Sequence, residues 1–259
     1  MIKNLMILFA STAIFTNAML GCATVNSHMS LSSRSSSEIP KDAFAFVAVS
    51  HTYTPEKCLD SLDYKKCQEL IGDLPPIVQQ GSGSGLLVWA KKTPIFLTAA
   101  HVCLDDMPDI FEIDGITIKI AKEIEIKIMN SKGKFMNTKI VKVDEKTDLC
   151  ALEVPKMDAA PVKLSHRPPS IGDKVYAISA PHGIFKPTMT LVFSGHYSGY
   201  GDRWHYYTIP TRPGSSGSVV LDKNYRAIGM LNAAFLKIEH IGLGAGYDEI
   251  IEFVSSIDD

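Results

Sequence analysis

The sequence predicts an all-β protein that consists of two antiparallel barrels and a short closing helix. Apolar runs of strand length recur along the chain and are separated by turn signals such as residues 130–133. A proline-rich bridge at residues 155–169 divides these runs into two groups. The spacing of apolar residues near the end of the sequence predicts a helix over residues 247–255.

The predicted strands follow one another in two sets, one on each side of the bridge. The first set comprises residues 43–49, 85–88, 95–99, 116–120, 124–129, 139–143 and 151–154. The second set comprises residues 174–178, 188–193, 205–209, 218–221, 227–231 and 241–245. With 259 residues, 46% of them hydrophobic, the chain is long enough to bury a core of this kind. We expect a cleft between the two barrels.

The first 21 residues differ in composition from the rest of the chain. Lys3 is their only charged residue, and the apolar run over residues 5–20 is short for a membrane span but typical of a signal peptide. The run ends in Gly21-Cys22, which is similar to a lipobox, so we expect export to the periplasm or cell envelope and lipidation of Cys22. Simple secretion and an uncleaved N-terminal anchor are the alternatives.

A serine-rich stretch follows the cysteine and has few apolar residues. Residues 22–42 are therefore expected to form a tether that anchors the protein to the membrane through its N-terminal lipid. The folded domain is expected over residues 43–259, with the first barrel over about residues 43–157 and the second over about residues 158–259.

Three residues that can perform nucleophilic catalysis stand beside predicted strands, in the order His, Asp, Ser. His101 ends an apolar run, Asp148 begins another, and Ser216 lies on a turn between Gly214 and Gly217. A serine hydroxyl is a poor nucleophile unless a base such as histidine takes its proton, and an aspartate can orient that base. Glycines let the turn bend tightly, so the backbone amides of Gly214 and Ser216 can converge on an oxyanion.

These motifs resemble those of trypsin-like serine peptidases, nearest to the bacterial HtrA/DegP type and the glutamyl endopeptidases. Residues 98–101 match the Thr-Ala-Ala-His motif, and residues 214–217 match the start of Gly-x-Ser-Gly-Gly; Ser218 departs from its last glycine. The resemblance spans about residues 43–254. It implies a chymotrypsin-like fold of two six-stranded barrels and an endopeptidase that hydrolyses proteins or peptides through an acyl-enzyme. Few residues follow the predicted helix, so we expect no PDZ domain.

The resemblance also implies a specificity pocket. Pro210 stands where trypsins carry an acidic residue, and Leu231 stands where glutamyl endopeptidases carry a histidine. Neither basic nor glutamyl specificity is therefore expected, and we predict a largely uncharged pocket for small or medium apolar side chains. Its expected residues are Pro210, Thr211, Leu231, Asn232, Ala233 and Gly244.

Four cysteines remain after Cys22, and four cysteines allow three pairings. Cys103 follows His101 by two residues and Cys150 follows Asp148 by two, so a triad that joins the histidine and the aspartate should also join these cysteines. Cys58 and Cys67 would then form the second disulfide, as expected in an oxidising compartment. Free buried thiols are the alternative.

Other classes of function fit the sequence less well. A net charge of −2 and a pI near 6.4 give no reason to expect nucleic acid as a partner. The sequence has no HExxH motif or phosphate loop, so we expect no metal and no cofactor. An α/β-hydrolase would need the order Ser, Asp, His. The rival from another class is a catalytically silent pseudo-peptidase that acts as a surface-tethered binding protein.

Overall fold

The structure is a computed structural model that describes residues 38–60, 64–113, 115–187, 189–235 and 238–257. The predicted signal peptide, the lipidation site Cys22 and most of the predicted tether lie outside the described residues. Within the described part of the chain, no helix has the length and apolar character needed to cross a membrane.

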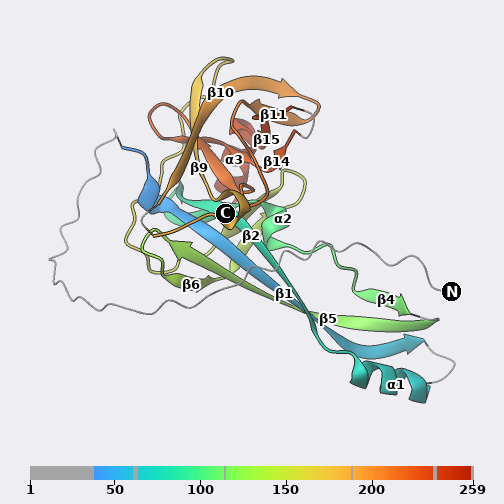
Figure 1. Cartoon of the computed structure of the whole chain (residues 1–259). Coiled ribbons are helices and arrows are strands. Elements are labelled where there is room, and N and C mark those ends of the chain that lie inside the picture. Colours follow the sequence, from blue (N-terminus) through green and yellow to red (C-terminus); the bar gives the residue numbers. More distant parts are fainter. Residues whose placement is uncertain (1–37, 61–63, 114, 188, 236–237, 258–259) are drawn as a thin grey trace, which may run out of the picture. The chain divides into compact units, whose positions relative to one another are not determined.

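The first half of the described chain forms one antiparallel sheet (Figure 1). Its strands are β1 (Phe44–Asp60), β2 (Ile77–Ala90), β3 (Thr93–Thr98), β4 (Ile110–Ile113), β5 (Ile116–Asn130), β6 (Phe135–Thr138), β7 (Ile140–Asp144) and β8 (Leu149–Leu152). Their order is β4-β5-β1-β2-β3-β8-β7, and β6 pairs with β5. The four residues of β8 are all buried, because both faces of this part of the sheet are covered.

The second half forms another antiparallel sheet. Its strands are β9 (Lys174–Ser179), β10 (Leu191–Gly201), β11 (Trp204–Tyr207), β12 (Ser218–Leu221), β13 (Ala227–Leu231), β14 (Ala233–Ala234) and β15 (Gly242–Gly244), in the order β13-β12-β9-β10-β11-β15-β14. The closing helix α3 (Tyr247–Ser255) buries Ile250, Phe253 and Val254. These residues belong to the same apolar cluster as Phe96 of β3 and Val219 of β12, so one core joins the two sheets.

The remaining helical segments are short. Two 3-10 turns, η1 (Lys41–Ala43) and η2 (Pro181–Gly183), precede β1 and follow β9. Helix α1 (Tyr64–Asp73) connects β1 to β2, and α2 (Ala100–Cys103) follows β3 directly. The α2 turn contains His101, which therefore lies where an apolar strand leaves the core.

The predicted fold class is confirmed, but the two sheets have eight and seven strands where six were expected in each. Two strands were predicted at residues 116–120 and 124–129, whereas β5 is continuous from Ile116 to Asn130. The gap between the two predicted strands, residues 121–123, pairs with residues 52–54 of β1, which is of similar length, so the backbone ladder continues through it. Strands β4 and β6 and helix α1 were not predicted.

The long strands carry an extension of the first sheet that we call the arm. It comprises residues 53–60 of β1, helix α1, the following residues to Ile77, strand β4 and residues 116–122 of β5. In Figure 1 α1 and β4 lie at the far end of β1 and β5. The arm has a small apolar core around Cys67, Ile116 and Ile118, and a disulfide between Cys58 and Cys67 closes it.

Candidate active site

The predicted base and its predicted orienting carboxylate meet where β3 ends and β8 begins, two strands that are neighbours in the first sheet. Nδ1 of His101 lies 2.8 Å from Oδ2 of Asp148, and the backbone amide of His101 donates to Oδ1 of the same carboxylate at 2.9 Å. One carboxylate thus fixes both the imidazole ring and the backbone that carries it. The imidazole is 47% exposed, and because Nδ1 faces the carboxylate, Nε2 is the ring nitrogen that remains for a substrate.

A disulfide joins the two segments that carry this pair. Cys103, two residues after His101, is bonded to Cys150, two residues after Asp148, and both cysteines are fully buried. The pairing is the one that the sequence analysis predicted, as is the pairing of Cys58 with Cys67. The covalent link limits how far the α2 turn and strand β8 can separate.

Asp148 has a left-handed backbone, with a φ of 56°, and Asn232 holds this turn in place. The side-chain amide of Asn232 donates to the carbonyl oxygens of Asp148 at 3.0 Å and of Thr147 at 3.3 Å. Left-handed conformations are uncommon for residues other than glycine, although aspartate adopts them more readily than most, and the contacts from Asn232 stabilise this one. Asn232, which was predicted to line the specificity pocket, thus also supports the aspartate turn across the two sheets.

The turn that carries Ser216 packs against the end of β3. A side chain on Gly217, whose φ is 86°, would overlap the carbonyl oxygen of Ser84 and come within 2.9 Å of the amide nitrogen of Ala99. Gly83 is equally confined, since a Cβ there would lie 2.8 Å from Val102 and 3.0 Å from the carbonyl oxygen of Ser216. Because Ala99 and Val102 flank the histidine turn, these contacts bring Ser216 to the same region as His101.

The carbonyl groups on this turn are held by hydrogen bonds from other elements. The carbonyl of Pro213 accepts from the amide of His182 at 2.6 Å, and the carbonyl of Ser216 accepts from the amide of Ser84 at 2.8 Å. The carbonyl of Gly214 accepts from the hydroxyl of Ser84, also at 2.8 Å. The orientation of each peptide unit in the turn is therefore determined by its neighbours.

The amides of Gly214 and Ser216, the predicted oxyanion donors, donate no hydrogen bond within the described ranges. Gly214 is buried and has a φ of 89°, a conformation that suits glycine. Backbone amides that are fixed in direction and lack an internal acceptor are the usual components of an oxyanion hole. The geometry is thus compatible with the predicted role of both groups.

The hydroxyl of Ser216 donates to the carbonyl of Asn232 at 3.4 Å, and no hydrogen bond joins it to His101 in the described part of the chain. In unliganded enzymes, hydrogen bonds between catalytic groups are often long and tighten only when substrate binds. A rotation about the Cα–Cβ bond of Ser216 changes the partner of its hydroxyl without moving the backbone.

The residues predicted for the specificity pocket are brought together only in part. The Thr211 hydroxyl and the Leu231 side chain both face Gly242, where a Cβ would overlap the former and lie 2.7 Å from the latter. Ala233 is half-buried and pairs with Leu243, while Gly244 packs directly on the carbonyl of Met230. Gly242 was not among the residues named from the sequence, because its closeness to Thr211 depends on the pairing of β11 with β15. Pro210 is half-buried beside this group.

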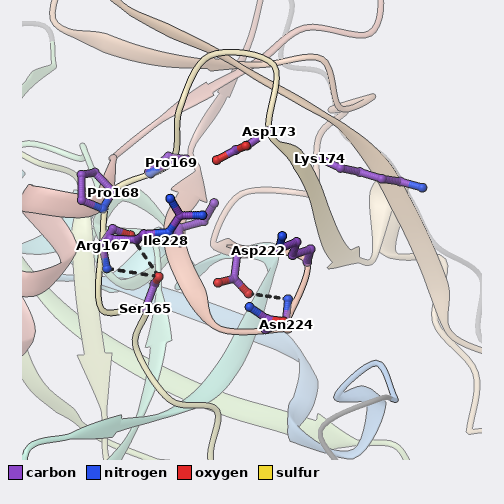
Figure 2. A pocket seen from close by; sticks show the side chains of 10 residues that line it. Ser165, Arg167, Pro168, Pro169, Asp173, Lys174, Asp222, Asn224 and Ile228 are labelled. Atoms are coloured by element: carbon purple, nitrogen blue, oxygen red, sulfur yellow. Dashed lines mark hydrogen bonds between the residues drawn. The ribbon is translucent and has the colours of Figure 1, made fainter.

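Ser84 and His182, which support the turn, were not predicted as site residues from the sequence. Ser84 belongs to a Gly-Ser-Gly stretch that opens a predicted strand, and this motif was the only available signal. The cavity drawn in Figure 2 lies elsewhere, around Ser165, Arg167, Asp173 and Asp222, and none of its lining residues belongs to the predicted triad.

Comparison with protein-family models gives a match between residues 83–230 and the model described as a trypsin-like peptidase domain. The matched segment contains all three predicted triad residues and more than half of the chain. None of the curated protein sequences matches the chain significantly.

Solved structures with a similar fold include a serine endoprotease from Yersinia pestis, with a TM-score of 0.54 and 19% sequence identity over 85% of this chain and 65% of that chain. The HtrA-type protease AlgW, solved with a tripeptide, gives a TM-score of 0.57 and 19% identity over 86% of this chain and 62% of that one. The chain therefore spans somewhat less than two thirds of each of these proteins. At this level of identity the likeness shows a shared chymotrypsin-like fold.

Proposed function

The chain belongs to the trypsin-like peptidase family, and on that premise we propose that it is a serine endopeptidase with His101, Asp148 and Ser216 as its catalytic triad. The observation that supports this proposal is the paired carboxylate and imidazole beside a serine turn with two unengaged amides. These are the components that acyl transfer through a serine requires.

In the proposed reaction, Ser216 attacks the carbonyl carbon of the scissile peptide bond while Nε2 of His101 takes the hydroxyl proton. Asp148 stabilises the imidazolium through Nδ1, and the amides of Gly214 and Ser216 donate to the oxyanion of the tetrahedral intermediate. His101 then transfers the proton to the departing amine, leaving an acyl-enzyme. Water, deprotonated by His101, hydrolyses the acyl-enzyme and restores Ser216.

A fluorophosphonate probe and an internally quenched peptide library test this function together. We expect the probe to label Ser216 and the protein to hydrolyse peptides, and we expect Ser216→Ala or His101→Ala to lower kcat/KM by about 10³-fold or more. The matched control is Ser215→Ala, since the hydroxyl of this fully buried neighbour is occupied by a hydrogen bond from the amide of Arg212. Labelling of Ser215, or full activity without Ser216, would contradict the assignment.

A pseudo-peptidase remains the competing function, and the same experiment separates the two. The observation that favours it is the Ser216 hydroxyl, which donates to Asn232 and not to His101. A folded protein that binds peptides but neither reacts with the probe nor hydrolyses any library member would support this second function.

We also propose that the protein is exported and anchored by a lipid on Cys22. The support is the apolar run that ends in Gly21-Cys22 in the sequence. In cells that express the full chain, Cys22→Ala should abolish incorporation of labelled palmitate and move the protein out of the membrane fraction. A mature N-terminus at any other residue would contradict the proposal.

For specificity, we propose small or medium apolar residues before the scissile bond, and dominant cleavage after Arg, Lys or Glu would contradict it.

A further inference from the structure

A polar pocket opens directly beside His101. It has a volume of about 450 Å³ and lies between strands β1 and β2 on one side and the segment that follows His101 on the other. Its walls include His51, Gln79, Ser82, His101, Asp105 and Asp106. No residue of the Ser216 turn and none of the predicted specificity residues belongs to these walls, so the pocket lies on the histidine side of the scissile bond.

An apolar pocket continues from the polar pocket into the arm. It has a volume of about 150 Å³, and its lining is almost entirely apolar, with Leu74, Ile77, Phe111 and Ile118 among its residues. The two pockets share Tyr53 and Met107, which makes them consecutive parts of one groove. An enclosed apolar cavity of about 150 Å³ in another protein holds a benzene molecule, so this pocket can take a phenyl or branched aliphatic side chain.

Strand β2 runs along this groove from Ser82 in the polar pocket to Ile77 in the apolar pocket. Over these residues β2 pairs with β1, and among the described strands none pairs with its other edge, because the ladder with β3 begins only at Leu86. The exposed edge offers backbone groups to an extended peptide. Five residue steps at about 3.3 Å each give a path of roughly 17 Å, the length of five residues of extended chain.

We infer that this groove binds the part of a polypeptide substrate that follows the scissile bond, with a bulky apolar side chain seated in the arm. The inference rests on the proposed function. His101 gives its proton to the departing amine, so the chain beyond that amine must leave the catalytic centre past His101. The polar pocket lies in that direction, and the path along β2 places the apolar pocket at about the fourth to sixth residue after the scissile bond.

The charged residues in and beside the polar pocket indicate which substrate side chains it prefers. Lys122 forms ion pairs with Asp105 at 3.2 Å and Asp109 at 2.8 Å and donates to the carbonyl of Met107. Asp106 is exposed on the pocket wall and makes no ion pair within the described ranges. Basic or polar side chains are therefore preferred between the scissile bond and the apolar anchor.

Covalent and apolar contacts within the arm hold the walls of the apolar pocket in place. The disulfide between Cys58 and Cys67 and the cluster around Ile118 fix helix α1 against β1 and β5. A preformed apolar pocket binds a side chain without the cost of ordering its own walls. The substrate class is thus an extended or unfolded segment, because a folded protein does not present six consecutive residues to a groove of this kind.

Internally quenched peptides that share one cleavage sequence test the inference. Each carries Phe or Ser at one position from the third to the seventh residue after the scissile bond. We expect kcat/KM to be about tenfold higher with Phe at one of the fourth to sixth positions. Ile77→Asp, which puts a carboxylate into the apolar pocket, should reduce this ratio to about twofold or less.

Val78→Asp is the matched control. Val78 is 56% exposed and Ile77 60% exposed on the same strand, but Val78 points to the other face of the sheet and does not line the pocket. It should keep the full Phe/Ser ratio, and a peptide ending two residues after the scissile bond should be hydrolysed equally by all three proteins. A ratio near one at every position in the wild type, or an equal loss in Val78→Asp, overturns the inference.

Failure of the groove and failure of the catalytic proposal give different results. If the short peptide is hydrolysed but Phe has no advantage, the groove assignment is wrong and the endopeptidase function stands. If the wild type neither hydrolyses peptides nor reacts with the fluorophosphonate, the function is wrong. Binding then tests the groove assignment, measured by fluorescence anisotropy with labelled peptides of the segment after the scissile bond. The assignment is supported if the Phe peptide binds the Ser216→Ala variant more tightly than it binds the double variant Ser216→Ala and Ile77→Asp. Equal binding to the two variants overturns it.

Discussion

The hydroxyl of Ser84 donates a 2.8 Å hydrogen bond to the carbonyl of Gly214, 130 residues further along the chain. The same hydroxyl accepts from the amide of Ala180 at 2.9 Å, and Ser84 is fully buried. A single side chain on the first sheet therefore fixes the peptide unit between the two proposed oxyanion donors. It also fixes the segment whose His182 amide holds the carbonyl of Pro213.

Removal of this hydroxyl should impair catalysis more than binding. Ser84→Ala leaves the carbonyl of Gly214 and the amide of Ala180 buried without partners, at a cost of about 1–3 kcal/mol each. The oxyanion donors then lose their fixed direction, and we expect kcat to fall about tenfold or more with little change in KM. Ser179→Ala is the control, since Ser179 is equally buried but its hydroxyl has no partner among the described residues. Equal kcat values in both variants would exclude the positioning role.

Asn232 is expected to position the proposed orienting aspartate. Asn232→Ala removes the amide that donates to the carbonyls of Thr147 and Asp148, so the left-handed turn loses its restraint. We expect kcat/KM to decrease about tenfold, on the scale of a misplaced catalytic group. Asn224→Ala, in an exposed turn, is the control. The measurement is kcat/KM at several pH values for the wild type and both variants. A folded Asn232→Ala protein with the kcat/KM of the wild type at every pH would contradict this prediction.

The two disulfides should differ in their effect on activity. Replacing both Cys103 and Cys150 with alanine removes the link between the histidine turn and β8, and we expect a loss of about 2–5 kcal/mol in the free energy of unfolding together with reduced kcat. Replacing both Cys58 and Cys67 affects the arm, so hydrolysis of short peptides should be unchanged. Urea denaturation and kinetics measure both effects, and non-reducing peptide mapping should recover the two bonds. A crosslink between Cys58 and Cys103 would contradict the pairing.

Stability should decrease as the solution becomes mildly acidic. Burial lowers the pKa of His51 and of His205 below the ordinary value of 6.5, although Asp105 and Glu249 oppose this effect. Below that pH the unfolded chain binds more protons than the folded one, so the free energy of unfolding falls until the pH reaches the depressed pKa values of the folded state. Urea titrations between pH 8 and pH 5 measure the slope. The double variant His51→Gln and His205→Gln should show a smaller slope, and an unchanged slope would rule out these two histidines as its source.

Much of the fold followed from local sequence patterns, and the exceptions have a common cause. The buried strands β8, β12 and β13 are short apolar runs between turn signals; β12 and β13 were predicted with their observed limits, and β8 was placed two residues too late. Strand β5 was predicted as two strands, because residues 121–123 join them only through pairing with the long strand β1. Long-range pairing of this kind leaves no periodic signal in either strand alone.

In the candidate site, too, the residues in local motifs were predicted from the sequence, and the contacts between the two sheets were not. His101, Asp148 and Ser216 were named because each stands in a recognisable local motif, and the cysteine pairing followed from the equal two-residue offsets of Cys103 and Cys150 from the predicted base and carboxylate. Ser84 could not be assigned a role, since its partner lies on a turn of the other sheet. Asn232 was assigned to a pocket wall, because the sequence gives its position after β13 but not the direction of its amide.

The long sequence separation of the contact between Ser84 and Gly214 has a consequence for folding kinetics. Contacts between residues that are distant in sequence form late, because closing a long loop costs chain entropy before any contact compensates for it. The turn that carries Ser216 can therefore reach its final geometry only after both sheets have formed. During refolding from denaturant, peptide hydrolysis should recover later than the far-ultraviolet circular dichroism of the strands. A newly synthesised chain would accordingly form its strands before it could hydrolyse other polypeptides nearby.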